Sequence, residues 1–142
     1  MLHAHSGLRW LALALLVIAI INALSNKNKN TYAKKDKLIN LFAMVTLHIQ
    51  VTIGIVVAFL SGKINYSEGW MKNPMFRCFG MEHILLMVSA TILITIGRKK
   101  AEKIENLSQR NSKIALWYTF VLILILAGIP WPFRTALGGS WF

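Results

Sequence analysis

The sequence is poor in the residues that characterise soluble and secreted domains. Of its 142 residues, five are Asp or Glu, three are Pro and one is Cys. The single cysteine, Cys78, excludes an internal disulfide and a thiolate metal cluster. Charged residues make up 15% of the chain and hydrophobic residues 56%, whereas a soluble domain has about a quarter charged and about half apolar residues. The composition therefore excludes an ordinary soluble domain.

Motifs of soluble enzymes are missing as well. The chain has no glycine-rich phosphate loop and no Cys-based or His–Glu zinc spacing. His3 and His5 lack the carboxylate neighbours that would make them a metal site of their own. A stand-alone enzyme is therefore not predicted, although the sequence leaves catalytic activity open.

Four long apolar runs dominate the chain. They cover Leu8–Leu24, Leu38–Leu60, Phe79–Gly97 and Ile114–Trp131. Each is close to the roughly 20 residues that an α-helix needs to cross a bilayer, and none alternates as a barrel strand does. The first run is not expected to be a cleaved signal peptide, because positive charge follows it instead of preceding it. We predict an all-α fold, an integral membrane four-helix bundle in one domain, residues 1–142.

The net charge of +11 is concentrated in two connectors. These carry Lys27, Lys29, Lys34, Lys35 and Lys37 after the first run, and Arg98, Lys99, Lys100, Lys103, Arg110 and Lys113 after the third. An even number of spans separates the connectors, so they lie on one side, which the positive-inside rule makes cytoplasmic. We expect a multi-pass protein of the bacterial inner membrane with both termini on the outer, periplasmic side. Nucleic-acid binding is not predicted, because Tyr32 is the only aromatic residue in these connectors.

Ionisable residues inside the spans are the candidate functional residues, because such groups are rare in a bilayer. The candidates are His3, His5, Arg9, His48, Arg77, Glu82 and His83. At 1.5 Å per residue, His48 lies roughly 15 Å and His83 roughly 21 Å above the charged inner ends of their helices. We therefore expect two imidazoles at similar depth on consecutive antiparallel helices.

Two facing imidazoles are the axial ligands that a low-spin b-type haem requires. The sequence thus predicts haem b between the second and third spans, with His48 and His83 as ligands to the iron. Arg9 and Arg77 lie outward of this pair and would anchor the propionates. Gly80 on the side of His83 would let a flat macrocycle approach the backbone.

Plain structural roles compete with this interpretation. A histidine in a membrane can simply hydrogen-bond to another helix, and Arg9 and Arg77 can extend to the outer headgroups. Glu82 is expected to form a structural ion pair with one of these arginines. His3 and His5 also fit ordinary interfacial residues.

Five segments of the chain carry a family resemblance. They are LHAHSGLRW (Leu2–Trp10), TLHIQVTIG (Thr46–Gly54), RCFGMEH (Arg77–His83), ITIGRKK (Ile94–Lys100) and LAGIPWPF (Leu126–Phe133). Together they resemble the short four-helix membrane proteins of the cytochrome b-like type. The resemblance implies a haem-binding protein of electron transfer, and the histidines it would carry over are His5, His48 and His83.

The pairing of these histidines has two solutions. Large quinol-oxidising cytochromes b place two widely spaced histidines on each of two helices, and no helix here does so, which argues against a stacked pair of haems. The depth estimate favours His48 with His83. The competing pair is His5 with His83, with a haem close to the outer surface and His48 left as an internal hydrogen-bond partner.

The expected function is therefore electron transfer by a membrane-embedded b-type cytochrome. It would act as a subunit of a respiratory complex, with a quinone as a candidate partner. The alternative is a haem-free accessory subunit that contacts lipid and other membrane subunits. A small transporter that uses Glu82 has less support, because this carboxylate lies near the outer end of its helix.

Overall fold

The structure is a computed structural model that describes residues 2–138 and 141. The described part is helical and contains no strand. Its long helices are α1 (Leu2–Lys29), α2 (Lys34–Leu60), α4 (His83–Glu102) and α5 (Leu107–Gly128). Its short helical segments are η1 (Trp70–Lys72), α3 (Pro74–Arg77), η2 (Cys78–Glu82) and η3 (Thr135–Leu137). The predicted all-α, four-helix architecture is confirmed.

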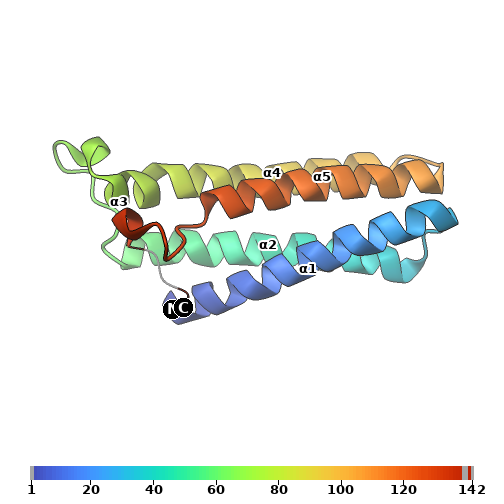
Figure 1. Cartoon of the computed structure of the whole chain (residues 1–142), viewed down its shortest axis with the longest axis horizontal. Coiled ribbons are helices and arrows are strands. Elements are labelled where there is room, and N and C mark those ends of the chain that lie inside the picture. Colours follow the sequence, from blue (N-terminus) through green and yellow to red (C-terminus); the bar gives the residue numbers. More distant parts are fainter. Residues whose placement is uncertain (1, 139–140, 142) are drawn as a thin grey trace.

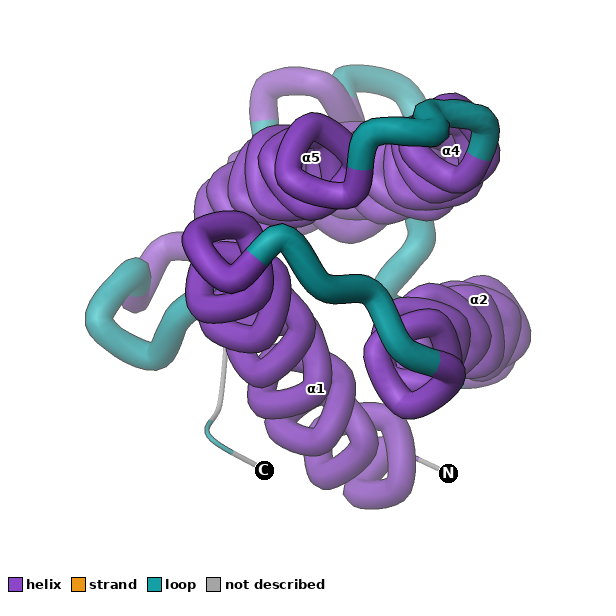
Figure 2. The backbone as a smooth tube through the Cα atoms, turned by 90° about the vertical axis from the view of Figure 1, so that its right-hand side faces the viewer, coloured by secondary structure: helices purple, strands orange, loops and turns teal. Residues whose placement is uncertain are grey.

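The four long helices run up and down in one bundle (Figure 1). Seen along the bundle, each helix has two neighbours, so that α1 lies diagonally across from α4 (Figure 2). Both chain ends lie at one end of the bundle, called the terminal end below. The two basic connectors lie at the other end, called the basic end.

Four helical stretches are long and apolar enough to cross a membrane. They are His3–Lys29, Lys34–Leu60, Pro74–Glu102 and Leu107–Gly128. At 1.5 Å per residue, the 28 residues of α1 span about 42 Å, close to the thickness of a bilayer with its headgroups. The helices extend beyond the predicted apolar runs because hydropathy marks only the segment in hydrocarbon, whereas lysine is also a good helix former.

The last helix ends three residues before the predicted boundary. α5 stops at Gly128, and Ile129 is extended with φ −69° and ψ 128°. Pro130 follows, and the residue before a proline is sterically kept out of the helical region. The last carbonyls of α5 lack helical N–H partners, so they can accept hydrogen bonds from elsewhere.

The third span is not a uniform α-helix. Asn73 caps its start, because its side-chain oxygen accepts hydrogen bonds from the backbone N–H groups of Met75 (3.0 Å) and Phe76 (3.3 Å). The wider turn η2 follows, and the N–H of His83 donates to the carbonyl of Cys78, five residues back. Such π-helical turns occur frequently at functional sites. Here the turn sets the direction in which the side chain of His83 projects from the helix.

The interior of the bundle is packed with small residues. Ala19, Ala23, Ala90 and Ala101 are each 0% exposed. Several large side chains, such as Tyr118, Ile94 and Ile114, are also 0% exposed. Many other large apolar side chains point outward, and they include Phe59, Leu60, Ile21, Leu85 and Leu116, which are 59–74% exposed. Small residues at helix contacts are typical of helices that associate in lipid. The surface thus fits contact with a bilayer, as predicted.

Candidate functional site

A pocket of about 110 Å³ lies toward the terminal end of the bundle. Its walls come from α1, α2, α4 and the end of α5, and they are mostly apolar. The polar and charged residues that line it are His5, Ser6, Arg9, Gln50, Ser61, Lys63 and His83. An apolar pocket with a few converging polar groups is the typical form of a ligand site.

His83 stands on α4, directly after the π-helical turn, and lines this pocket. Its Nδ1 lies 2.7 Å from the carbonyl oxygen of Gly128. A carbonyl can only accept, so Nδ1 carries the hydrogen and donates it. In the neutral ring Nε2 then keeps its lone pair, and it has no hydrogen-bond partner among the described residues. The carbonyl of Gly128 thus fixes both the orientation of His83 and its tautomer.

His5 enters the same pocket from α1 and rests on α2. The side-chain amide of Gln50 donates to the backbone carbonyl of His5 at 2.8 Å, and its nitrogen lies 3.5 Å from His5 Nε2. Gly54, one turn along α2, provides the space for the ring, because a Cβ there would lie 2.7 Å from His5 Cε1. Gln50 and Gly54 therefore form a seat for His5.

Two buried polar atoms in this seat lack protein partners. His5 Nδ1 and Gln50 Oε1 have no hydrogen-bond partner in the described part of the chain, and Gln50 is 6% exposed. Leaving a buried donor or acceptor unpaired costs about 1–3 kcal/mol. Orphaned groups of this kind in a pocket indicate that a ligand or water completes the site.

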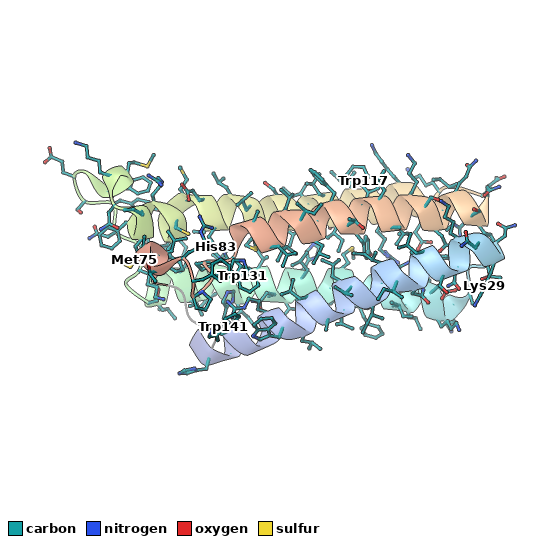
Figure 3. The ribbon with its side chains drawn as sticks, viewed as in Figure 1. Lys29, Met75, His83, Trp117, Trp131 and Trp141 are labelled. Carbon is teal, nitrogen blue, oxygen red and sulfur yellow. The ribbon has the colours of Figure 1, made fainter. Side chains whose placement is uncertain are left out.

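Arg9 also lines the pocket, one turn after His5 on α1. Its guanidinium donates to the carbonyl of Trp141 at 2.7 Å and lies 5.3 Å from the ring centroid of Trp10. The Trp10 ring also lies 6.3 Å from that of Trp131 and 6.2 Å from that of Trp141. His83, Trp131 and Trp141 all lie toward the terminal end (Figure 3). The C-terminal segment thus packs beside the pocket.

His48 does not line this pocket. It is exposed on the outer side of α2 and lines a shallow groove with Thr91, Ile92, Thr95 and Ile96. Its Nδ1 lies 2.8 Å from the carbonyl of Met44, and its Nε2 lies 3.2 Å from Thr95 Oγ1. Both ring nitrogens therefore have protein partners. The structure brings together His5 and His83 and separates both from His48, so the depth-based preference for His48 with His83 does not fit this geometry.

Arg77 does not line the pocket either. Its Nε is 2.7 Å from Glu82 Oε1, and Nη1 donates to the carbonyl of Met71 at 3.3 Å. The predicted ion pair of Glu82 with an arginine is thus confirmed for Arg77. His3 is exposed near the start of α1, which matches an interfacial residue.

Sequence reasoning missed three parts of the pocket. Gln50 and Gly54 lie on the side of α2 that faces α1, whereas the prediction followed the side that carries His48. The signal was present in the spacing of Leu47, Gln50, Val51 and Gly54, which share one helical side at i, i+3, i+4 and i+7. The third part is Lys63, which was not among the candidates because it lies between the second and third apolar runs.

A metal site of the usual protein type is not found in the described residues, because no three of His, Cys, Asp and Glu come together there. The pocket instead offers two imidazoles, which suit a metal that brings further ligands of its own. Comparisons with protein families, with characterised proteins and with solved structures found no match for this chain.

Proposed function

We propose that the chain is a membrane-embedded electron-transfer protein of the cytochrome b type that binds haem b in this pocket. The imidazoles of His5 and His83 would be the axial ligands. The observation that carries the proposal is that these two residues reach one pocket from diagonally opposite helices, and that His5 Nδ1 and His83 Nε2 have no hydrogen-bond partner among the described residues. The bound haem would supply one-electron chemistry.

The donor chemistry of the pocket suits this cofactor. Histidines that bind metals usually donate their second ring N–H to a carbonyl or carboxylate, which fixes the ring and raises its basicity. His83 makes such a bond to Gly128 at 2.7 Å. At His5 the restraint is different, because the Gln50 amide donates to the backbone carbonyl of His5 and Gly54 leaves room for its ring.

The space in the pocket sets a condition on the proposal. A cavity of about 150 Å³ holds a single benzene ring, and this pocket measures about 110 Å³. A porphyrin is several rings wide. Haem binding therefore requires that the helices around the pocket move apart. The haem-bound protein is expected to have a wider terminal end than the structure described here.

We further propose that the terminal end faces the periplasm of a bacterial inner membrane. The positive-inside rule supports this, because the basic end carries both lysine- and arginine-rich connectors. The haem pocket would then lie near the outer surface of the membrane, where a partner subunit of a respiratory complex could exchange electrons with it.

A second candidate is the binding of a quinone headgroup in the same pocket. The volume of about 110 Å³ favours a ligand with one ring. His5 Nδ1 and Gln50 Oε1 are unpartnered, so a carbonyl or hydroxyl oxygen on that ring could pair with either atom. In this case the chain would hold or exchange a quinone, and it would bind no haem.

The absorption spectrum of the purified protein tests these proposals. Protein from haem-replete cells is expected to show a redox-sensitive Soret band. His5→Ala or His83→Ala should abolish the band or shift it to that of a single-ligand haem. His48→Ala is the matched control and should leave it unchanged, because His48 lies outside the pocket.

The other outcomes separate the alternatives. A colourless preparation that contains quinone after solvent extraction would overturn the haem proposal and support the second candidate. A preparation with neither would leave a haem-free accessory subunit of a larger complex. Loss of the band in both His48→Ala and His83→Ala, but not in His5→Ala, would restore the pairing that the depth estimate favoured.

A further inference from the structure

The pocket carries positive charge without acidic residues. Arg9 and Lys63 both line it, and none of its lining residues is Asp or Glu. The ion pairs found in the described part of the chain join Arg77 to Glu82 and Arg98 to Glu102, and they leave Lys63 without a carboxylate.

The end of α2 directs Lys63 toward the pocket. Ser61 caps the helix, and Gly62 adopts the left-handed conformation with φ 65°, which turns the chain. The N–H of Lys63 then donates to Ser61 Oγ at 3.3 Å. Its ammonium lies 4.7 Å from the ring centroid of Phe79, another pocket residue. The lysine is half-buried over an aromatic ring and does not extend freely into water.

We infer that Lys63 is an anion anchor that binds the carboxylate of an amphipathic ligand whose apolar body occupies the pocket. The apolar walls accept the body, and a cation at the edge of a low-dielectric region attracts an anion more strongly than one in water does. The inference rests on the proposed function, in which the carboxylates are the haem propionates. It assigns to Lys63 the role that the sequence gave to Arg77, whose guanidinium is paired with Glu82.

Haem and its dimethyl ester provide the test, because the ester lacks the propionate charges and keeps the macrocycle. Wild-type protein, prepared without haem, is titrated with each compound in detergent. We expect tighter binding of haem than of the ester. Lys63→Gln should weaken haem binding by about tenfold, the effect of losing one charge-assisted contact, and should leave ester binding unchanged. Lys63→Arg should retain the preference for haem.

Lys72→Gln is the matched control, because Lys72 lies in the same outer segment, is exposed and does not line the pocket. It should behave as wild type. A long-chain fatty acid forms a further arm of the experiment, since it carries the same carboxylate. If it displaces haem from wild type but not from Lys63→Gln, the anchor is confirmed and also accepts lipid carboxylates.

The failures can be told apart. Equal binding of haem and ester by wild type, or equal weakening of both in Lys63→Gln, overturns the anchor and leaves the histidine ligands intact. A protein that binds neither compound fails the proposed function itself, and the inference fails with it.

Discussion

At the scale of single residues, hydrogen bonds to backbone carbonyls decide what the histidines of this protein can do. His83 donates its Nδ1 hydrogen to the carbonyl of Gly128 on α5, so its Nε2 keeps a lone pair that can bind a ligand in the pocket. The Nδ1 of His48 is hydrogen-bonded to the carbonyl of Met44, one turn earlier in the same helix. Residues of one type at similar depths thus differ in chemistry because their partners differ.

A second group of polar residues lies at the basic end, around Tyr32. The Tyr32 hydroxyl donates to Glu102 Oε1 at 2.5 Å and accepts from Asn40 Nδ2 at 3.2 Å. Arg110 lies over its ring at 4.8 Å from the centroid. Burial, followed by the hydrogen bond to Glu102, raises the pKa of Tyr32 to about 12. This hydroxyl therefore joins the first connector to the end of α4.

This raised pKa predicts a loss of stability in alkali. Tyr32 is neutral in the folded protein, and unfolding returns its pKa to the ordinary value of 10.0. Its contribution to the free energy of unfolding is therefore complete below pH 10 and is lost as the pH rises toward about 12. Thermal unfolding in detergent across this range measures the loss. Tyr32→Phe should be less stable at neutral pH and show a smaller decline, and an equal decline in both proteins would contradict the assignment.

At the scale of helices, two irregular turns position the side chain of His83 in the pocket. The π-helical turn Cys78–Glu82 orients His83, and the early end of α5 leaves the Gly128 carbonyl to accept from it. Pro130 accounts for that end. Two departures from regular helix, far apart in the sequence, therefore combine to hold one imidazole.

Close packing of α4 on α5 is a second feature at this scale. A Cβ at Gly97 would lie 2.5 Å from the Cβ of Trp117, which Figure 3 places toward the basic half of the bundle. Gly97→Ala should lower the free energy of unfolding by about 1–3 kcal/mol, because the tryptophan and the helix backbone must shift. Unfolding in a denaturing detergent series measures this change.

Gly7 on α1 provides the control for that substitution. Within the described part of the chain, no atom lies within 4 Å of a Cβ built at this position. Gly7→Ala should therefore leave the packing intact and stabilise the helix by up to about 1 kcal/mol. If both variants lost the same stability, the close contact at Gly97 would not be the cause.

At the scale of the whole molecule, the two ends differ in charge and in structure. The basic end carries the charged connectors and the polar group around Tyr32, and the terminal end carries the pocket and the cluster of Trp10, Trp131 and Trp141. The orientation proposed for the membrane places the terminal end outside. A label that cannot cross the membrane tests it directly.

Cysteine labelling is simple in this chain because its only native cysteine, Cys78, is 3% exposed. In a Cys78→Ser background, Glu68→Cys should react from outside in spheroplasts. Lys35→Cys should react only after the membrane is opened, because it lies at the basic end. The reverse pattern would overturn the orientation and move the pocket to the cytoplasmic side.

Much of this architecture was predictable from local sequence. The four spans follow from runs of apolar residues, and the position of both termini at one end follows from an even number of helices. The pairing of Glu82 with an arginine was expected as well, although the partner, Arg77, lies five residues away across the π-helical turn. These features depend on composition and on spacing along one segment.

The sequence by itself determined the number of helices, their approximate depth and the end at which positive charge gathers. Only the tertiary structure decided which histidines share a pocket. Depth increases steadily along a helix, but two residues apart, such as His48 and Gln50, point to nearly opposite sides. The side that faces inward depends on how α2 packs against α1 and α4, and that packing depends on contacts between residues far apart in the chain.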